Sequence, residues 1–180
     1  MRIVAWVVLV LTSMAAMGAL EAHRWAVGWL GAALFILALV FIAVLIHELA
    51  HAVAAVAVGA RVSRIVVVPF EYTLRPRKLG FLKHRLRGDL GGYVSYTLDR
   101  IEARKRHAIV AVAGPLANIA TGMAAAGIPS LDHSRDLSAA TAVATAFAIL
   151  SVGMGLANLL PFDGSDGARL LRYFRPVRRR

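Results

Sequence analysis

The sequence predicts an all-α polytopic membrane protein with about four transmembrane helices and a small β-rich cytoplasmic insertion. Hydrophobic residues make up 59% of the 180-residue chain, and charged residues make up only 17%, below the usual quarter of a soluble domain. The apolar residues are also gathered in long runs with almost no charge, which excludes a disordered chain and disfavours a soluble globule. The length of residues 1–180 fits a single domain.

Four stretches are apolar enough for a membrane helix, which needs about 20 residues. They cover residues 3–20, 25–59, 107–127 and 138–160. Gly59 ends the second stretch, at a position where a glycine C-cap of a helix is expected. Helices therefore account for most of the predicted fold.

The first stretch has an alternative interpretation. Arg2, the apolar run and the small residues at its end are also typical of a cleaved signal peptide. The run is longer than most signal-peptide cores, and no sharp cleavage site follows it. A membrane span is therefore the favoured interpretation.

The segment 61–106 is the large part of the chain that is not expected to be helical. Val62–Val68 is rich in β-branched residues and predicts a strand. A second strand is expected over Leu90–Tyr96, where Gly91 and Gly92 would let another segment approach the backbone closely. Proline and glycine residues punctuate the chain between the two strands.

The basic residues indicate an orientation in the membrane. Of the 21 Lys and Arg residues, only Arg24 and Arg135 fall on one side of the four-span arrangement. The positive-inside rule places the rich side, with the insertion and both termini, in the cytoplasm. We therefore expect an integral protein of a prokaryotic cell membrane.

The net charge of +11 also predicts attraction to anionic lipids of the bilayer. The basic tail, residues 167–180, is expected to act as a solvated anchor at the membrane surface. Nucleic acid is not expected as a partner, because the basic residues are not interleaved with aromatic residues that could stack on bases.

The second apolar stretch contains the sequence HELAH at residues 47–51. The spacing of four places His47 and His51 on one helix face, where two neutral imidazoles can bind one zinc ion. Glu48 lies beside them and can act as a general base. Ionisable groups inside an apolar helix are costly, so this cluster indicates function. The chain has no cysteine, so a metal must be held by His, Asp or Glu.

A catalytic zinc typically takes three protein ligands and keeps one position open. Pro161 ends the fourth apolar stretch and can direct the chain after it back towards the helices. Asp163 and Asp166 follow, and both are candidates for the third ligand. Spacing alone does not choose between them.

Three sequence blocks together resemble the site-2 protease family of intramembrane zinc metalloproteases, peptidase family M50. They are HELAH at 47–51, AGPLAN at 113–118, and NLLP at 158–161 followed by Asp166-Gly167. Their order and spacing agree over about residues 35–172. The resemblance implies a zinc metalloendopeptidase that cuts a transmembrane protein substrate in or near its membrane segment, as in regulated intramembrane proteolysis.

The resemblance also implies a role for each matching residue. His47 and His51 match the two histidine ligands of zinc, and Asp166 matches the third ligand, which favours the second of the two aspartates. Glu48 matches the catalytic glutamate. Asn118 matches a position near the active site, where it would stabilise the substrate or its oxyanion; an asparagine in a membrane helix also commonly hydrogen-bonds to a neighbouring helix.

Two other functions fit parts of the pattern. A non-proteolytic metal-binding membrane scaffold would use the same ligands, but it would not need the base Glu48. A metal transporter would also place His and Asp side chains inside the membrane. A single site with a general base fits hydrolysis better than transport.

The topology gives a first prediction. The insertion and the C-terminal tail should lie on the same, cytoplasmic side, because two spans separate them. Reporter fusions at Gly80 and after Arg180 should therefore both give the cytoplasmic signal. Opposite signals would remove one span and separate Asp166 from the two histidines.

Overall fold

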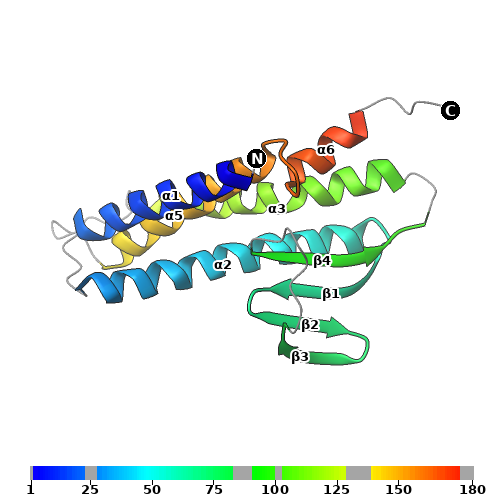
Figure 1. Cartoon of the computed structure of the whole chain (residues 1–180), viewed down its shortest axis with the longest axis horizontal. Helices are drawn as coiled ribbons and strands as arrows, with labels where there is room; N and C mark the ends of the chain where they lie inside the picture. The colour runs from blue at the N-terminus through cyan, green and yellow to red at the C-terminus, as the bar shows by residue number, and fades with distance from the viewer. Residues whose placement is uncertain (1, 23–27, 83–90, 100–102, 129–138, 175–180) are drawn as a thin grey trace. The chain divides into compact units, whose positions relative to one another are not determined.

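The computed structural model describes residues 2–22, 28–82, 91–99, 103–128 and 139–174 (Figure 1). The described chain is mostly helical and carries a four-stranded antiparallel sheet, which confirms the predicted fold class. The helices are α1 (Arg2–Ala22), α2 (Gly28–Ala57), α3 (Ala103–Ala126), α5 (Ala139–Leu159) and α6 (Asp166–Phe174). The strands are β1 (Arg61–Val67), β2 (Phe70–Leu74), β3 (Arg77–Phe81) and β4 (Gly92–Thr97).

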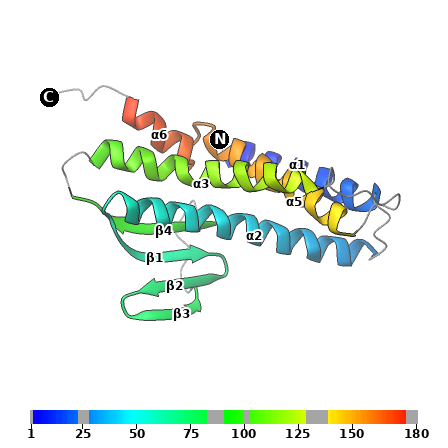
Figure 2. The same cartoon turned by 180° about the vertical axis from the view of Figure 1, so that it is seen from behind.

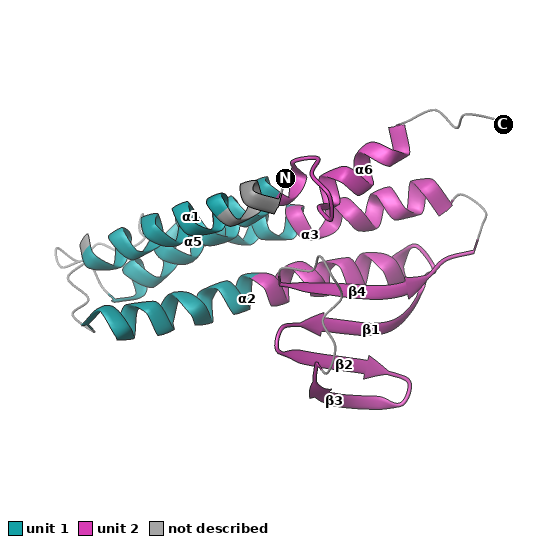
Figure 3. Cartoon of the chain, in the orientation of Figure 1, with its two compact units in different colours: residues 1–43, 116–157 teal, residues 44–115, 158–180 magenta. Residues whose placement is uncertain are grey.

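The chain forms two compact units, shown in different colours in Figure 3. The first unit contains residues 1–43 and 116–157, and the second contains residues 44–115 and 158–180. Both α2 and α3 contribute one part of their length to each unit. All of the sheet and α6 belong to the second unit.

Three of the described helices, α2, α3 and α5, are long and apolar enough to cross a membrane, and α1 contains a shorter apolar stretch, Val7–Glu21. Of these, α2 is the most apolar, yet little of its surface is buried. Along its length it exposes a series of large apolar side chains: Leu30, Leu34, Leu37, Ile42, Leu49, Val53 and Val56. Soluble proteins rarely expose such a continuous apolar surface. These features indicate an integral membrane protein.

The first unit is built from closely packed apolar helices. A side chain at Gly153 would collide with Thr12, and one at Gly122 would collide with Val152. Glycines therefore let α1, α3 and α5 approach closely, as small residues commonly do in membrane proteins. The buried core of this unit consists of Ala16, Leu20, Ile36, Leu39, Ala142, Ala146 and Leu150.

The predicted glycine cap ends α2 and leads into the sheet. Gly59 has a φ of 81°, which glycine adopts without steric cost. The Ala60 N–H then donates to the Ala55 carbonyl at 2.8 Å, as expected for a helix that ends on a left-handed residue. The chain therefore leaves α2 in the direction of β1, whose C-terminal residues Val66 and Val67 are buried.

The strand order in the sheet is β3-β2-β1-β4, so β4 lies at one edge of the described sheet. The sequence predicted β1 and β4 but not β2 and β3, which form a hairpin (Figure 2). The pairs Val67↔Phe70 and Leu74↔Arg77 enclose tight turns that contain Pro69 and Pro76. The two prolines therefore occupy the turns and leave the intervening segments free to pair.

Candidate metal centre

Two histidines and a glutamate lie in the part of α2 that belongs to the second unit. His47, Glu48 and His51 are each at most 6% exposed. The imidazole rings of His47 and His51 are adjacent, with ring centroids 4.6 Å apart. The expected placement of both rings on one helix face is therefore confirmed.

Asp166 is brought to the histidines by α6, a short helix that covers the first part of the expected basic tail. The Ser165 hydroxyl accepts a hydrogen bond from the Ala168 N–H at 3.1 Å, which makes Ser165 the N-cap of α6. Gly167 fits only because it has no side chain, since a Cβ there would collide with the Leu159 carbonyl. The cap and this close contact together fix Asp166 in the first turn of α6.

The three candidate ligands converge on one point. The Asp166 Oδ2 atom lies 3.0 Å from the His47 Nε2 atom and 3.1 Å from the His51 Nε2 atom. The two Nε2 atoms lie 3.0 Å from each other. All three residues are buried, and each offers one ligand atom to this cluster. Two imidazoles and one carboxylate form a ligand set that is common for catalytic zinc.

The position of the ring proton on His51 indicates that a cation can bind where the three ligand atoms meet. Its Nδ1 atom lies 2.6 Å from the Val110 carbonyl, which can only accept, so Nδ1 carries the proton. In the neutral ring the Nε2 atom then presents a lone pair to the Asp166 carboxylate, which is also an acceptor. A second proton or a cation must lie between these atoms, and a metal-bound histidine typically makes this kind of Nδ1 hydrogen bond. The residues therefore fit a bound zinc ion.

Asp166 is held in its ionised form. Burial alone would raise its pKa, but the positive charge that Oδ2 shares with the His47 and His51 nitrogens, as a proton or a cation, holds the pKa of Asp166 well below its usual range. The Arg169 guanidinium lies 3.5 Å from the other carboxylate oxygen, Oδ1. The side chain can therefore offer a negative oxygen to a metal.

Glycines on α3 and β4 make room for the cluster. A Cβ on Gly114 would lie 2.5 Å from His51 Nε2 and 2.7 Å from His47 Nε2. A Cβ on Gly92 would lie 2.7 Å from Glu48 Cγ and 2.9 Å from Glu48 Oε1. The close approach expected at Gly92 is therefore confirmed, and both glycines serve the candidate site.

The other two predicted residues lie outside this cluster. Asp163 is exposed on the turn that precedes α6. Asn118 is fully buried in α3, in the part of the helix that belongs to the first unit. Its main-chain carbonyl accepts a hydrogen bond from the Ser151 hydroxyl at 2.9 Å. The catalytic role of Asn118 stays a prediction.

Two contributors to the site were not predicted. The Val110 carbonyl orients His51, but a backbone acceptor inside a helix leaves no signal in the sequence. Arg169 follows Asp166 by three residues, a spacing at which side chains of a helix meet. That signal could be used only once α6 was recognised as a helix.

The steric role of Gly114 gives a second prediction. Gly114→Ala should displace both imidazoles and weaken zinc binding by about tenfold or more, the scale seen for residues that orient metal ligands. Elemental analysis of the purified protein at limiting zinc measures this effect. Gly127→Ala is the matched control, because its nearest contact would be an ordinary 3.4 Å. Equal zinc content in both variants would contradict the role of Gly114.

Comparison with known proteins agrees with this geometry. Searches of curated proteins and of solved structures found no match for the chain. The sequence model of the family described as Peptidase family M50 matches residues 34–131, which is more than half of the chain. The matched region contains His47, Glu48, His51 and Asn118 and ends before Asp166. The chain therefore belongs to peptidase family M50, the site-2 protease family of metallopeptidases.

Proposed function

We propose that this M50 metallopeptidase is a zinc-dependent intramembrane endopeptidase that hydrolyses a peptide bond in or near a transmembrane segment of another membrane protein. The observation that carries the proposal is the buried cluster of His47, His51 and Asp166 beside Glu48. His47, Glu48 and His51 lie on α2, an apolar helix long enough to cross a membrane. A hydrolytic site on such a helix would act on substrates that are themselves in the membrane.

His47, His51 and Asp166 would hold the zinc, which when bound supplies Lewis-acid polarisation of the scissile carbonyl and makes water easier to deprotonate. Val110 keeps the His51 proton on Nδ1, so its Nε2 lone pair stays directed at the ligand point. The Glu48 carboxylate would accept a proton from the attacking water and pass it to the nitrogen of the leaving amine. Gly92 packs against Glu48 and limits where that carboxylate can lie.

The substrate must be locally extended, because a helix hides its peptide bonds. Among the described strands, β4 lies at a sheet edge, where an extended segment can add by main-chain hydrogen bonds. Gly92 at the start of β4 contacts the Glu48 side chain. A substrate paired along β4 would therefore pass close to the proposed general base. Anionic lipids around the basic cytoplasmic side would complete the environment of the enzyme.

The ligand assignment gives a third prediction. Purified protein should hold about one zinc ion per chain, and His47→Ala, His51→Ala and Asp166→Ala should each lower zinc occupancy. Asp163→Ala removes a carboxylate from the exposed turn nearby and should leave occupancy unchanged. Elemental analysis decides between the two aspartates. Loss of zinc in Asp163→Ala, with zinc retained in Asp166→Ala, would show that the ligand assignment is wrong.

The role of Glu48 gives a fourth prediction. Glu48→Gln keeps the size and polarity of the side chain but cannot accept the proton. It should retain zinc and lower turnover of a transmembrane test substrate by about a hundredfold or more, the usual scale of general-base catalysis. Zinc content and cleavage in liposomes are measured on the same preparation. Unchanged cleavage by a zinc-loaded Glu48→Gln protein would refute the mechanism, and zinc binding without any cleavage by the unmodified protein would favour a scaffold.

A further inference from the structure

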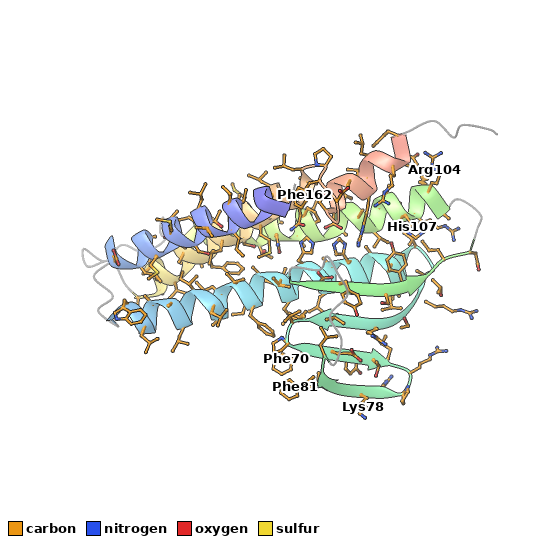
Figure 4. The ribbon with its side chains drawn as sticks, viewed as in Figure 1. Phe70, Lys78, Phe81, Arg104, His107 and Phe162 are labelled. Carbon is orange, nitrogen blue, oxygen red and sulfur yellow. The ribbon has the colours of Figure 1, made fainter. Side chains whose placement is uncertain are left out.

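The second unit contains a basic cavity of about 580 Å³ next to the candidate metal centre. Its basic lining comes from Arg104 and His107 at the start of α3 (Figure 4) and from Arg169 and Arg172 on α6. The remaining lining includes Tyr96 of β4. None of the described residues that line the cavity is acidic.

The cavity lining is held in place by specific contacts. Arg104 Nη2 donates to the carbonyls of Arg172 at 2.8 Å and Tyr173 at 2.6 Å, which are at the C-terminal end of α6. The Tyr96 hydroxyl lies 2.9 Å from His107 Nδ1. Burial raises the pKa of Tyr96, so its hydroxyl keeps its proton. These contacts tie α3 to α6 and to β4 around the cavity.

The chemistry of the lining calls for an anion. Guanidinium groups that face the same space repel one another, and a negative group among them relieves that repulsion. Arginine also offers a planar pair of donors that matches a carboxylate. Arg169 is positioned between the cavity and the candidate site, because it lines the cavity and also lies 3.5 Å from Asp166 Oδ1. A ligand bound in the cavity would therefore lie close to the proposed reaction centre.

We propose that this cavity binds the carboxylate of an Asp or Glu side chain in the substrate, on the cytoplasmic side of the cleaved bond. The inference rests on the proposed function, since it assigns a substrate feature to the same enzyme. The cavity is lined by the edge strand β4, along which the substrate is proposed to lie. This position along an edge strand favours a peptide carboxylate over the phosphate of a lipid headgroup, because a lipid headgroup does not pair with a strand.

Peptide binding to the full-length Glu48→Gln protein in detergent tests the inference without cleavage. The probes are fluorescent transmembrane peptides that carry a single Asp, Asn or Lys at successive positions on the cytoplasmic side. At one or two neighbouring positions, Asp should bind about fivefold to tenfold more tightly than Asn, as charge-assisted hydrogen bonds allow. In an added Arg172→Glu background this preference should disappear, and the Lys peptide should bind better than the Asp peptide.

Lys105→Glu is the matched control. Lys105 is exposed on α3 beside Arg104 but does not line the cavity. Lys105→Glu therefore changes the net charge by the same amount as Arg172→Glu without changing the cavity lining. The preference for Asp should survive in this variant. Arg172→Gln, which adds no negative charge, should lower the preference without reversing it, and this excludes a general loss of folding.

Three results would overturn the inference: equal binding of Asp and Asn peptides at every position, no binding of any peptide, or a preference that persists in Arg172→Glu. In a further part of the experiment, the same protein is titrated with phosphatidylglycerol and with inorganic phosphate. Binding of either one that depends on Arg172, without a preference for Asp peptides, would make the cavity a phosphate site and refute the inference. A zinc-loaded protein that prefers Asp peptides but cleaves none would contradict the proposed function while supporting the acidic subsite.

Discussion

The second unit is organised around the cost of burying three ionisable side chains in an apolar helix. A charged residue near the centre of a membrane helix costs about 2.5 to 3.5 kcal/mol on insertion scales unless it finds a partner. His47 and His51 find that partner in Asp166. The short helix α6, its Ser165 cap and the glycine that follows Asp166 all serve to deliver this carboxylate. A shift of α6 by one residue would put Ser165 or Gly167 in this position, and neither has a carboxylate.

The glycines of α3 show how one helix meets two different requirements. At Gly114 the missing side chain is the space into which the His47 and His51 rings project. At Gly122, in the first unit, the missing side chain lets α3 pack against Val152 of α5. From the sequence both glycines fit a ridge of small residues that packs membrane helices. Only the structure separates the glycine that makes room for a site from the glycine that makes room for a helix.

The parts of the fold that follow from local periodicity and composition were predictable. Long apolar runs predicted the membrane helices, and the HELAH spacing predicted the adjacent imidazoles. The hairpin β2–β3 was not predicted, because proline commonly interrupts strands, whereas Pro69 and Pro76 lie in the turns on either side of β2. The choice of Asp166 could not come from spacing either, since it depends on how the chain turns between Pro161 and the Ser165 cap. Contacts such as His51 with the Val110 carbonyl are set by tertiary packing alone.

The number of basic residues near the helix ends predicts the orientation of the chain, but it does not predict the contacts that each basic side chain makes. An orientation signal requires only that Lys or Arg residues lie near the ends of the membrane helices. It does not require Arg104 to donate to two carbonyls at the end of α6, or Arg169 to lie beside Asp166. Lysine at either position would satisfy the topology rule equally well, but an arginine that donates to both carbonyls through Nη2 has three further N–H groups on its other two nitrogens, where a lysine ammonium would have one. The arginines around the cavity therefore carry structural information beyond the orientation of the chain.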